Sequence, residues 1–125
     1  MGGFDTHANQ FNRQDRLLST FSSAMEVFVK DLKQNNTFKD TLILVFSEFG
    51  RRVQQNGAGG TDHGAANNVY IIGENLKKKG FYNDAPDLLR LDKNGDIIHT
   101  VDFRSIYASI LDKWLVVDDV SILNK

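Results

Sequence analysis

The chain has 125 residues, of which 41% are hydrophobic and 25% charged, a profile typical of one soluble domain. Its formal charge of -1 provides no global field that would attract nucleic acid or an anionic membrane. The absence of cysteine excludes disulfides and thiolate metal ligands, and it leaves the redox compartment undetermined. No apolar run approaches the roughly 18 residues of a membrane span. We therefore expect no nucleic-acid partner and no membrane span.

The first residues combine a flexible diglycine with two metal-binding side chains. Asp5 and His7 stand two residues apart, and on extended backbone this spacing points both side chains to the same side. They could then bind one ion. The stretch Met1–Phe4 is more typical of the end of a strand than of the start of a domain. We therefore expect the chain to be the C-terminal part of a larger domain.

A helix followed by a buried strand is predicted next. From about Gln10 to Asn35 apolar residues recur at spacings of three and four, which predicts an amphipathic helix that ends at Asn35-Asn36. The run Thr41–Phe46 is apolar throughout and rich in β-branched residues, which is typical of a strand covered on both faces in a parallel sheet. The order predicts a strand-helix-strand unit whose first strand lies at or before Met1.

The middle of the chain contains a glycine-rich loop between two predicted strands. Residues Gln54–Gly64 follow the buried strand and the segment Ser47–Arg52, and they precede a strand over Asn68–Gly73. Long loops inside compact domains are usually functional or mobile. Because ligands of open α/β sheets bind at the carboxyl ends of strands, Glu48 is expected at the same edge as the N-terminal ligand pair.

The C-terminal part contains a turn and a second helix. The Asn94-Gly95 pair between Leu89–Leu91 and Ile97–Ile98 predicts a small hairpin. Apolar residues from Phe103 to Leu115 predict an amphipathic helix, with Asp102 or Thr100 as its N-cap. No internal repeat or linker appears, so we predict one domain, residues 1–125.

Five side chains in predicted loops at one sheet edge are the candidate metal ligands. Each has a plain alternative as a cap, a turn or a backbone hydrogen bond, but their convergence favours a metal. Their nitrogen and oxygen atoms suit zinc first, with manganese, magnesium or calcium as alternatives. Arg51 or Arg52 would suit a two-pronged contact with phosphate or sulfate. His99 has no acidic or histidine neighbour at ligand spacing and is expected to be structural or exposed. The candidate ligands are Asp5, His7, Glu48, Asp62 and His63.

Four ordered motifs carry a family resemblance that spans nearly the whole chain. They are Gly2–His7 followed by Gln10, Phe46–Arg51, Gly60–Gly64 and Thr100–Ala108. Together they resemble the bacterial domain of unknown function 1501 family, which is itself similar to the alkaline phosphatase and sulfatase superfamily.

The resemblance implies an α/β fold and a ligand order. The fold would be a three-layer sandwich, a mostly parallel sheet with flanking helices, of which this chain holds only the C-terminal part. Two divalent metals would sit at the C-terminal edge of the sheet. Asp5 and His7 would be the first ligand pair, with Glu48 at the strand end and His63 in place of the last superfamily histidine. A rival assignment makes Asp62-His63 the displaced second pair.

The resemblance also implies a reaction and a gap. The superfamily attacks phosphate or sulfate esters, so the substrate would be a small anionic ester. Its nucleophile lies in an N-terminal half that this chain does not contain, and neither Thr6 nor Ser47 is in the expected position. The missing half would then be the partner of this chain. Many members of such families are exported, which suggests a periplasmic or exported bacterial protein.

Three functions remain open from the sequence. The first is a metal-dependent hydrolase of phosphate or sulfate esters, in which Arg51 contacts the anion. The second is a non-catalytic metal-binding or assembly module with the same fold. The third is an α/β fragment whose polar loops serve folding only.

Overall fold

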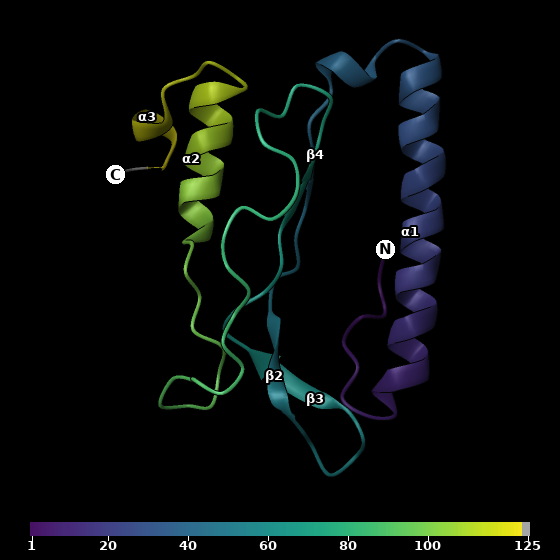
Figure 1. The fold of residues 1–125 in the computed structure, drawn as a ribbon, viewed down its shortest axis with the longest axis vertical. Helices are drawn as coiled ribbons and strands as arrows, with labels where there is room; N and C mark the ends of the chain where they lie inside the picture. The colour runs from purple at the N-terminus through teal and green to yellow at the C-terminus, as the bar shows by residue number, and fades with distance from the viewer. Residues whose placement is uncertain (124–125) are drawn as a thin grey trace.

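The computed structural model describes residues 1–123 and places short strands between two longer helices (Figure 1). Helix α1 stands on one side of the strands and α2 on the other. No helix within this range is long and apolar enough to cross a membrane. In chain order the elements are α1 (Gln10–Gln34), the 3₁₀ helix η1 (Phe38–Asp40), β1 (Ile43–Val45), β2 (Gly50–Gln55), β3 (Thr61–Gly64), β4 (Tyr70–Ile72), α2 (Phe103–Lys113) and α3 (Asp119–Leu123).

Helix α1 confirms the long amphipathic helix predicted from the apolar spacing. It begins after Asn9, whose φ of 46° is left-handed, and it ends before Asn36, whose φ is 61°. Asparagine tolerates this conformation better than most residues, so both ends are marked in the sequence. The helix packs against η1, where Phe38 is buried and the Nζ atom of Lys33 lies 5.3 Å from the centre of its ring.

The strands form two antiparallel ladders. β1 pairs with β4, with Ile43 opposite Ile72, which confirms the two predicted strands in shorter form. β2 pairs with β3, with Arg51 opposite His63. The prediction of a loop throughout Gln54–Gly64 is therefore wrong: its two ends are strands and only the middle is a turn. The reason is local pairing, which needs no long crossover.

The predicted parallel sheet does not correspond to the two ladders of the described residues. Residues 1–6 form no strand, and the described strands between Ile43 and Ile72 pair only antiparallel. The mostly parallel three-layer sandwich, like the single domain over residues 1–125, stays a prediction that rests on the family resemblance.

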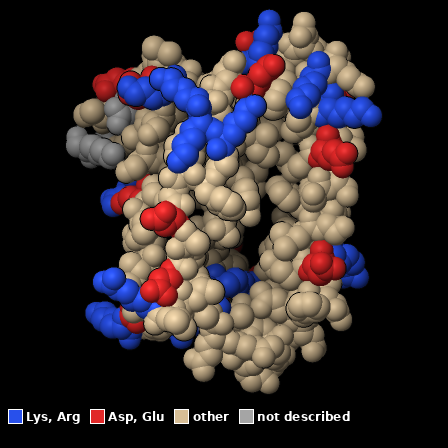
Figure 2. Space-filling model, in the orientation of Figure 1, with Lys and Arg blue, Asp and Glu red and all other residues tan. Residues whose placement is uncertain are grey.

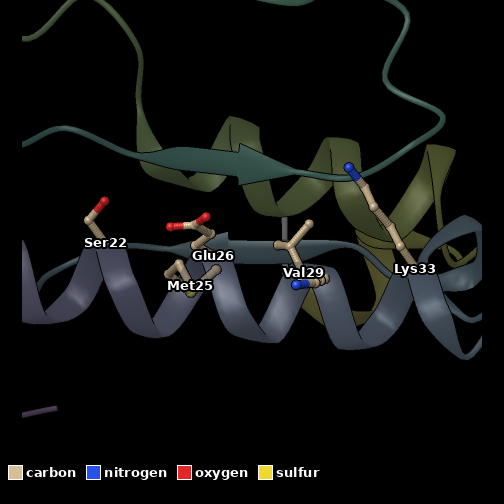
Figure 3. A pocket seen from close by; sticks show the side chains of 6 residues that line it. Ser22, Met25, Glu26, Val29 and Lys33 are labelled. Atoms are coloured by element: carbon tan, nitrogen blue, oxygen red, sulfur yellow. The ribbon is translucent and has the colours of Figure 1, made fainter.

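Large apolar side chains are exposed on α1, on α2 and next to the strands. Phe38 is buried, whereas Phe11, Phe46 and Phe103 are each more than half exposed. The surface is hollowed alongside α1 (Figure 2), and a hollow of about 550 Å³ is lined by residues of that helix alone (Figure 3). The apolar stripe of α1 is thus only partly covered. The residues lining the hollow are Ser22, Met25, Glu26, Val29, Lys30 and Lys33.

Helix α2 begins as predicted at an aspartate cap. The backbone N–H of Arg104 donates to Asp102 Oδ1 at 2.8 Å, and Arg104 Nε donates to the same oxygen at 3.0 Å. These hydrogen bonds lower the pKa of Asp102 from 3.8 to about 2. Before the helix, Leu91 bridges Ile97, which reduces the predicted hairpin to one pair. Helix α3 was not predicted.

The cap predicts an acid-sensitive start of α2. Because the pKa of Asp102 is lowered in the folded chain, its stabilisation is complete above pH 3.8 and is lost as the pH falls toward about 2. We expect the amide resonance of Arg104 and the helical circular dichroism to change together between these values. The Asp102→Asn variant should lack this step, and Glu26→Gln on α1 should keep it. Identical acid titrations of Asp102→Asn and the unchanged chain would contradict the prediction.

Candidate metal centre

Three of the predicted ligands form one cluster, which joins the N-terminal loop (residues 1–9) to β3. The His7 Nε2 atom lies 2.9 Å from Asp5 Oδ1 and 3.1 Å from His63 Nε2, and His63 Nε2 lies 2.8 Å from Asp5 Oδ1. Two ligand atoms on one zinc ion, each about 2.0–2.1 Å from it, are about 2.8–3.4 Å apart for bond angles between about 90° and 110°. The three atoms form a triangle, and the lengths of all three of its edges fall within the spacing that one ion imposes. We call these three residues the Asp-His-His triangle.

Hydrogen bonds alone cannot satisfy all three edges of the triangle. Each imidazole nitrogen carries either a proton or a lone pair, and an ionised carboxylate only accepts. If both Nε2 atoms carry protons, each can donate to Asp5, but the two N–H groups then face each other. If only one carries a proton, two lone pairs face each other instead. While Asp5 is ionised, at least one edge is repulsive in every protonation state of the two imidazoles, whereas a cation bound to all three atoms would attract each of them.

The N-terminal loop is held to the β2–β3 hairpin by main-chain contacts. The N–H of Asn9 donates to Ala58 O at 3.1 Å, and the N–H of Gln10 donates to Gly59 O at 3.0 Å. Thr61 Oγ1 then donates to the side-chain oxygen of Gln10 at 2.9 Å. These bonds fix the start of α1 against the hairpin turn, and they carry the Asp5–His7 segment to β3.

Gly60 permits this close approach. A Cβ atom at Gly60 would lie 2.3 Å from the carbonyl carbon of His7 and 2.7 Å from the nitrogen of Ala8. Both neighbours are backbone atoms, so no flexible side chain could yield. The glycine-rich composition of this stretch thus has a specific use, which is to let the His7 backbone lie on the hairpin turn.

Arg51 holds the two loops together from the neighbouring strand. Its Nη2 atom donates to Phe4 O at 2.6 Å and to Asp5 Oδ1 at 3.3 Å, and its Nη1 atom donates to Thr61 O at 2.7 Å. The side chain is only 20% exposed. Arg51 therefore lies beside the triangle, but these nitrogens are engaged with the protein. Its contact with an anion stays a prediction. The neighbouring Arg52 instead faces Asp96, with Nε 3.5 Å from Oδ1.

Phe49 is a site residue that the sequence analysis missed. Its ring stacks on His63 with a centroid distance of 3.6 Å and an interplanar angle of 10°. The Cζ atom of Arg51 lies 5.1 Å from the centre of the Phe49 ring. Phe49 thus forms a platform that limits how His63 can tilt. The spacing of polar residues carries no sign of it, and only the strand pairing of Arg51 with His63 brings it near.

The remaining predicted ligands lie outside the triangle. Asp62 Oδ1 is 3.3 Å from His7 Nδ1, the ring nitrogen that is not part of the triangle, and Asn56 Nδ2 donates to the same oxygen at 3.2 Å. Glu48 is exposed and is not one of the three grouped residues. The roles of Asp62 and Glu48 as ligands stay predictions.

The electrostatics keep both aspartates of this region ionised. A hydrogen bond from His63 lowers the pKa of Asp5 below its ordinary value, and the charges of His7, His63 and Arg51 add to this effect. The pKa of Asp62 is lowered by the hydrogen bond from Asn56 first and by that from His7 second. Both carboxylates are therefore negative at neutral pH, the form that a metal ion requires.

The contact at Gly60 predicts an unequal effect of two alanine substitutions in one turn. Gly60→Ala would push a Cβ into the His7 backbone and should destabilise the chain by about 1–3 kcal/mol, as overpacking commonly does. Gly57→Ala is the matched control, because a Cβ there meets nothing within 4 Å. Melting temperatures and the proximity of the His7 and His63 ring protons by NMR would be compared. Equal melting temperatures would show that the loop does not rest on the hairpin as described.

Comparison with known proteins identifies the family of the chain. No curated protein and no solved structure matches it. A family model described as "Protein of unknown function (DUF1501)" matches residues 1–117. The match includes the Asp-His-His triangle and the hairpin that supports it. It confirms the family resemblance predicted from the four motifs, and the chain belongs to the DUF1501 family.

Proposed function

We propose that the Asp-His-His triangle binds a divalent cation, zinc in the first instance and manganese, magnesium or calcium as alternatives. The observation that carries this proposal is the set of three donor atoms separated by 2.8–3.1 Å, which hydrogen bonds cannot satisfy together. Two imidazoles and one carboxylate are a ligand set that zinc uses in catalytic sites, where a further position stays open. The three side chains are about half exposed, so water or a substrate can approach that position.

We propose further that the protein carrying this chain hydrolyses small phosphate or sulfate esters. What supports this reaction class is the resemblance to the alkaline phosphatase and sulfatase superfamily that the sequence motifs suggest, which stays a prediction. The chemistry supplied by a bound cation would be Lewis-acid polarisation of an ester oxygen. Arg51 would add positive charge beside the substrate, because its guanidinium lies against Asp5 at one corner of the triangle.

The nucleophile of such a reaction would come from residues outside this chain. Thr6 is only 1% exposed, and its Oγ1 atom faces Phe4 O and Gln14 Oε1, each at 3.4 Å. Ser47 Oγ donates to the backbone oxygen of Phe49 at 2.9 Å. Neither hydroxyl faces the triangle in these contacts. The exposed apolar side chains on both sides of the strands offer a surface that the remainder of such a domain could cover.

Metal binding can be tested by titrating the chain with zinc in a calorimeter. We expect His7→Ala, His63→Ala and Asp5→Asn each to weaken binding by at least roughly tenfold, because each removes one of three ligands. His99→Ala is the matched control, since it removes the one histidine outside the triangle. An unaltered chain that binds no divalent ion, or variants that bind as well as the control, would refute the proposed centre.

Ester hydrolysis needs a separate test on the whole protein that carries this chain. Turnover of an aryl phosphate or an aryl sulfate should disappear on chelation and in His7→Ala and His63→Ala, but persist in His99→Ala. Zinc binding without any turnover would instead favour the second candidate, a non-catalytic metal-binding or assembly module. The hydroxyls of Thr6 and Ser47 favour this candidate, because both contact other protein atoms and neither faces the triangle in these contacts.

A further inference from the structure

The imidazole of His7 lies between two carboxylates, one at each ring nitrogen. Its Nε2 atom faces Asp5 Oδ1 at 2.9 Å, inside the triangle. Its Nδ1 atom faces Asp62 Oδ1 at 3.3 Å, outside the triangle. The two nitrogens of one ring point in widely different directions. An oxygen that meets Nδ1 therefore cannot share an ion with Nε2, which separates Asp62 from the donor atoms of the triangle.

The contact with Asp62 decides which nitrogen of His7 carries a proton. An ionised carboxylate has no proton to donate, so His7 Nδ1 must be the donor in this pair. Nε2 also faces a carboxylate, but His63 Nε2 already donates to that Asp5 oxygen at 2.8 Å, and a proton on His7 Nε2 would face the proton of His63 across 3.1 Å. In the neutral ring we therefore expect Nε2 to keep its lone pair. That lone pair faces Asp5 and His63, where a cation would use it. A hydrogen bond to the second nitrogen is the usual means by which a protein orients a metal-binding histidine.

Asp62 is itself held by the turn of the hairpin. Asn56 Nδ2 donates to Asp62 Oδ1 at 3.2 Å and to the backbone oxygen of His7 at 2.9 Å. The side-chain oxygen of Asn56 accepts the N–H groups of Ala58 and Gly60, each at 3.0 Å. One amide side chain thus ties together the turn, the backbone of His7 and the carboxylate at its ring. The position of Asp62 is set by these bonds before any ion binds.

We propose that Asp62 is a positioning residue, which fixes His7 in the Nδ1-protonated tautomer and so presents Nε2 to the triangle. The metal-binding consequence rests on the proposed function, whereas the tautomer does not. This assignment differs from the ligand role that the sequence suggested for Asp62. It places the carboxylate behind the ligand that it supports, with Asn56 holding the carboxylate.

The tautomer can be measured without metal. In the metal-free chain with nitrogen-labelled histidine, at about pH 8 where an ordinary histidine is neutral, two-bond nitrogen-proton spectra distinguish Nδ1 from Nε2 protonation. We expect His7 to be protonated at Nδ1 in the unchanged chain and in Asp62→Asn, whose amide oxygen can still accept. In Asp62→Ala the proton should move to Nε2. Asp84→Ala, which removes an exposed carboxylate elsewhere, is the matched control and should leave the spectrum unchanged.

Zinc affinity supplies the second measurement. We expect Asp62→Ala to weaken zinc binding by roughly 10–100-fold, as loss of a partner behind a ligand commonly does, and Asp62→Asn to restore part of the loss. A folded Asp62→Ala variant that keeps the Nδ1 proton and the full affinity would overturn the proposal, as would an Nε2-protonated His7 in the unchanged chain. If the unchanged chain binds no zinc, the proposed metal centre fails, but the tautomer spectra still decide the role of Asp62.

Discussion

The docking of the N-terminal loop on the turn of the β2–β3 hairpin is the contact on which the candidate site depends. Asp5 and His7 lie 58 and 56 residues before His63 in the sequence, and this contact brings them together with the help of Arg51 and Asn56. It consists of backbone hydrogen bonds from Asn9 and Gln10 to the turn, and it is possible because Gly60 has no side chain. Main-chain bonds position a loop more precisely than exposed ion pairs do, because side-chain pairs at a surface contribute little.

Without a cation, contacts inside the cluster destabilise it, whereas its surroundings hold it in place. The three ligand atoms of the triangle lie within hydrogen-bonding distance of one another, and while Asp5 is ionised at least one of the three pairs is repulsive in every protonation state of the two imidazoles. The surroundings nevertheless hold the atoms in place: Phe49 supports one ring, Asp62 the other, and Arg51 the carboxylate. A cluster that is braced from outside and strained inside is a reasonable arrangement for a site organised in advance for an ion.

The same fold leaves much apolar surface without a cover. α1 packs against η1 but presents part of its apolar stripe to a hollow, and Phe46 and Phe103 are exposed beyond the strands. Exposed apolar surface is where another part of a protein can bind. The proposal that further residues of the same domain complete the site is compatible with these exposed side chains.

The sequence by itself determined the local elements and the kinds of ligand. Apolar spacing predicted α1 and α2, β-branched runs predicted β1 and β4, and the residue types predicted a centre built from nitrogen and oxygen atoms, because each of these signals is carried by neighbouring residues. Only the tertiary structure decided the hairpin register, the platform formed by Phe49 and the place of Asp62 behind His7. Those features depend on which segments meet across the turn, and residue spacing along the chain does not encode such distant contacts.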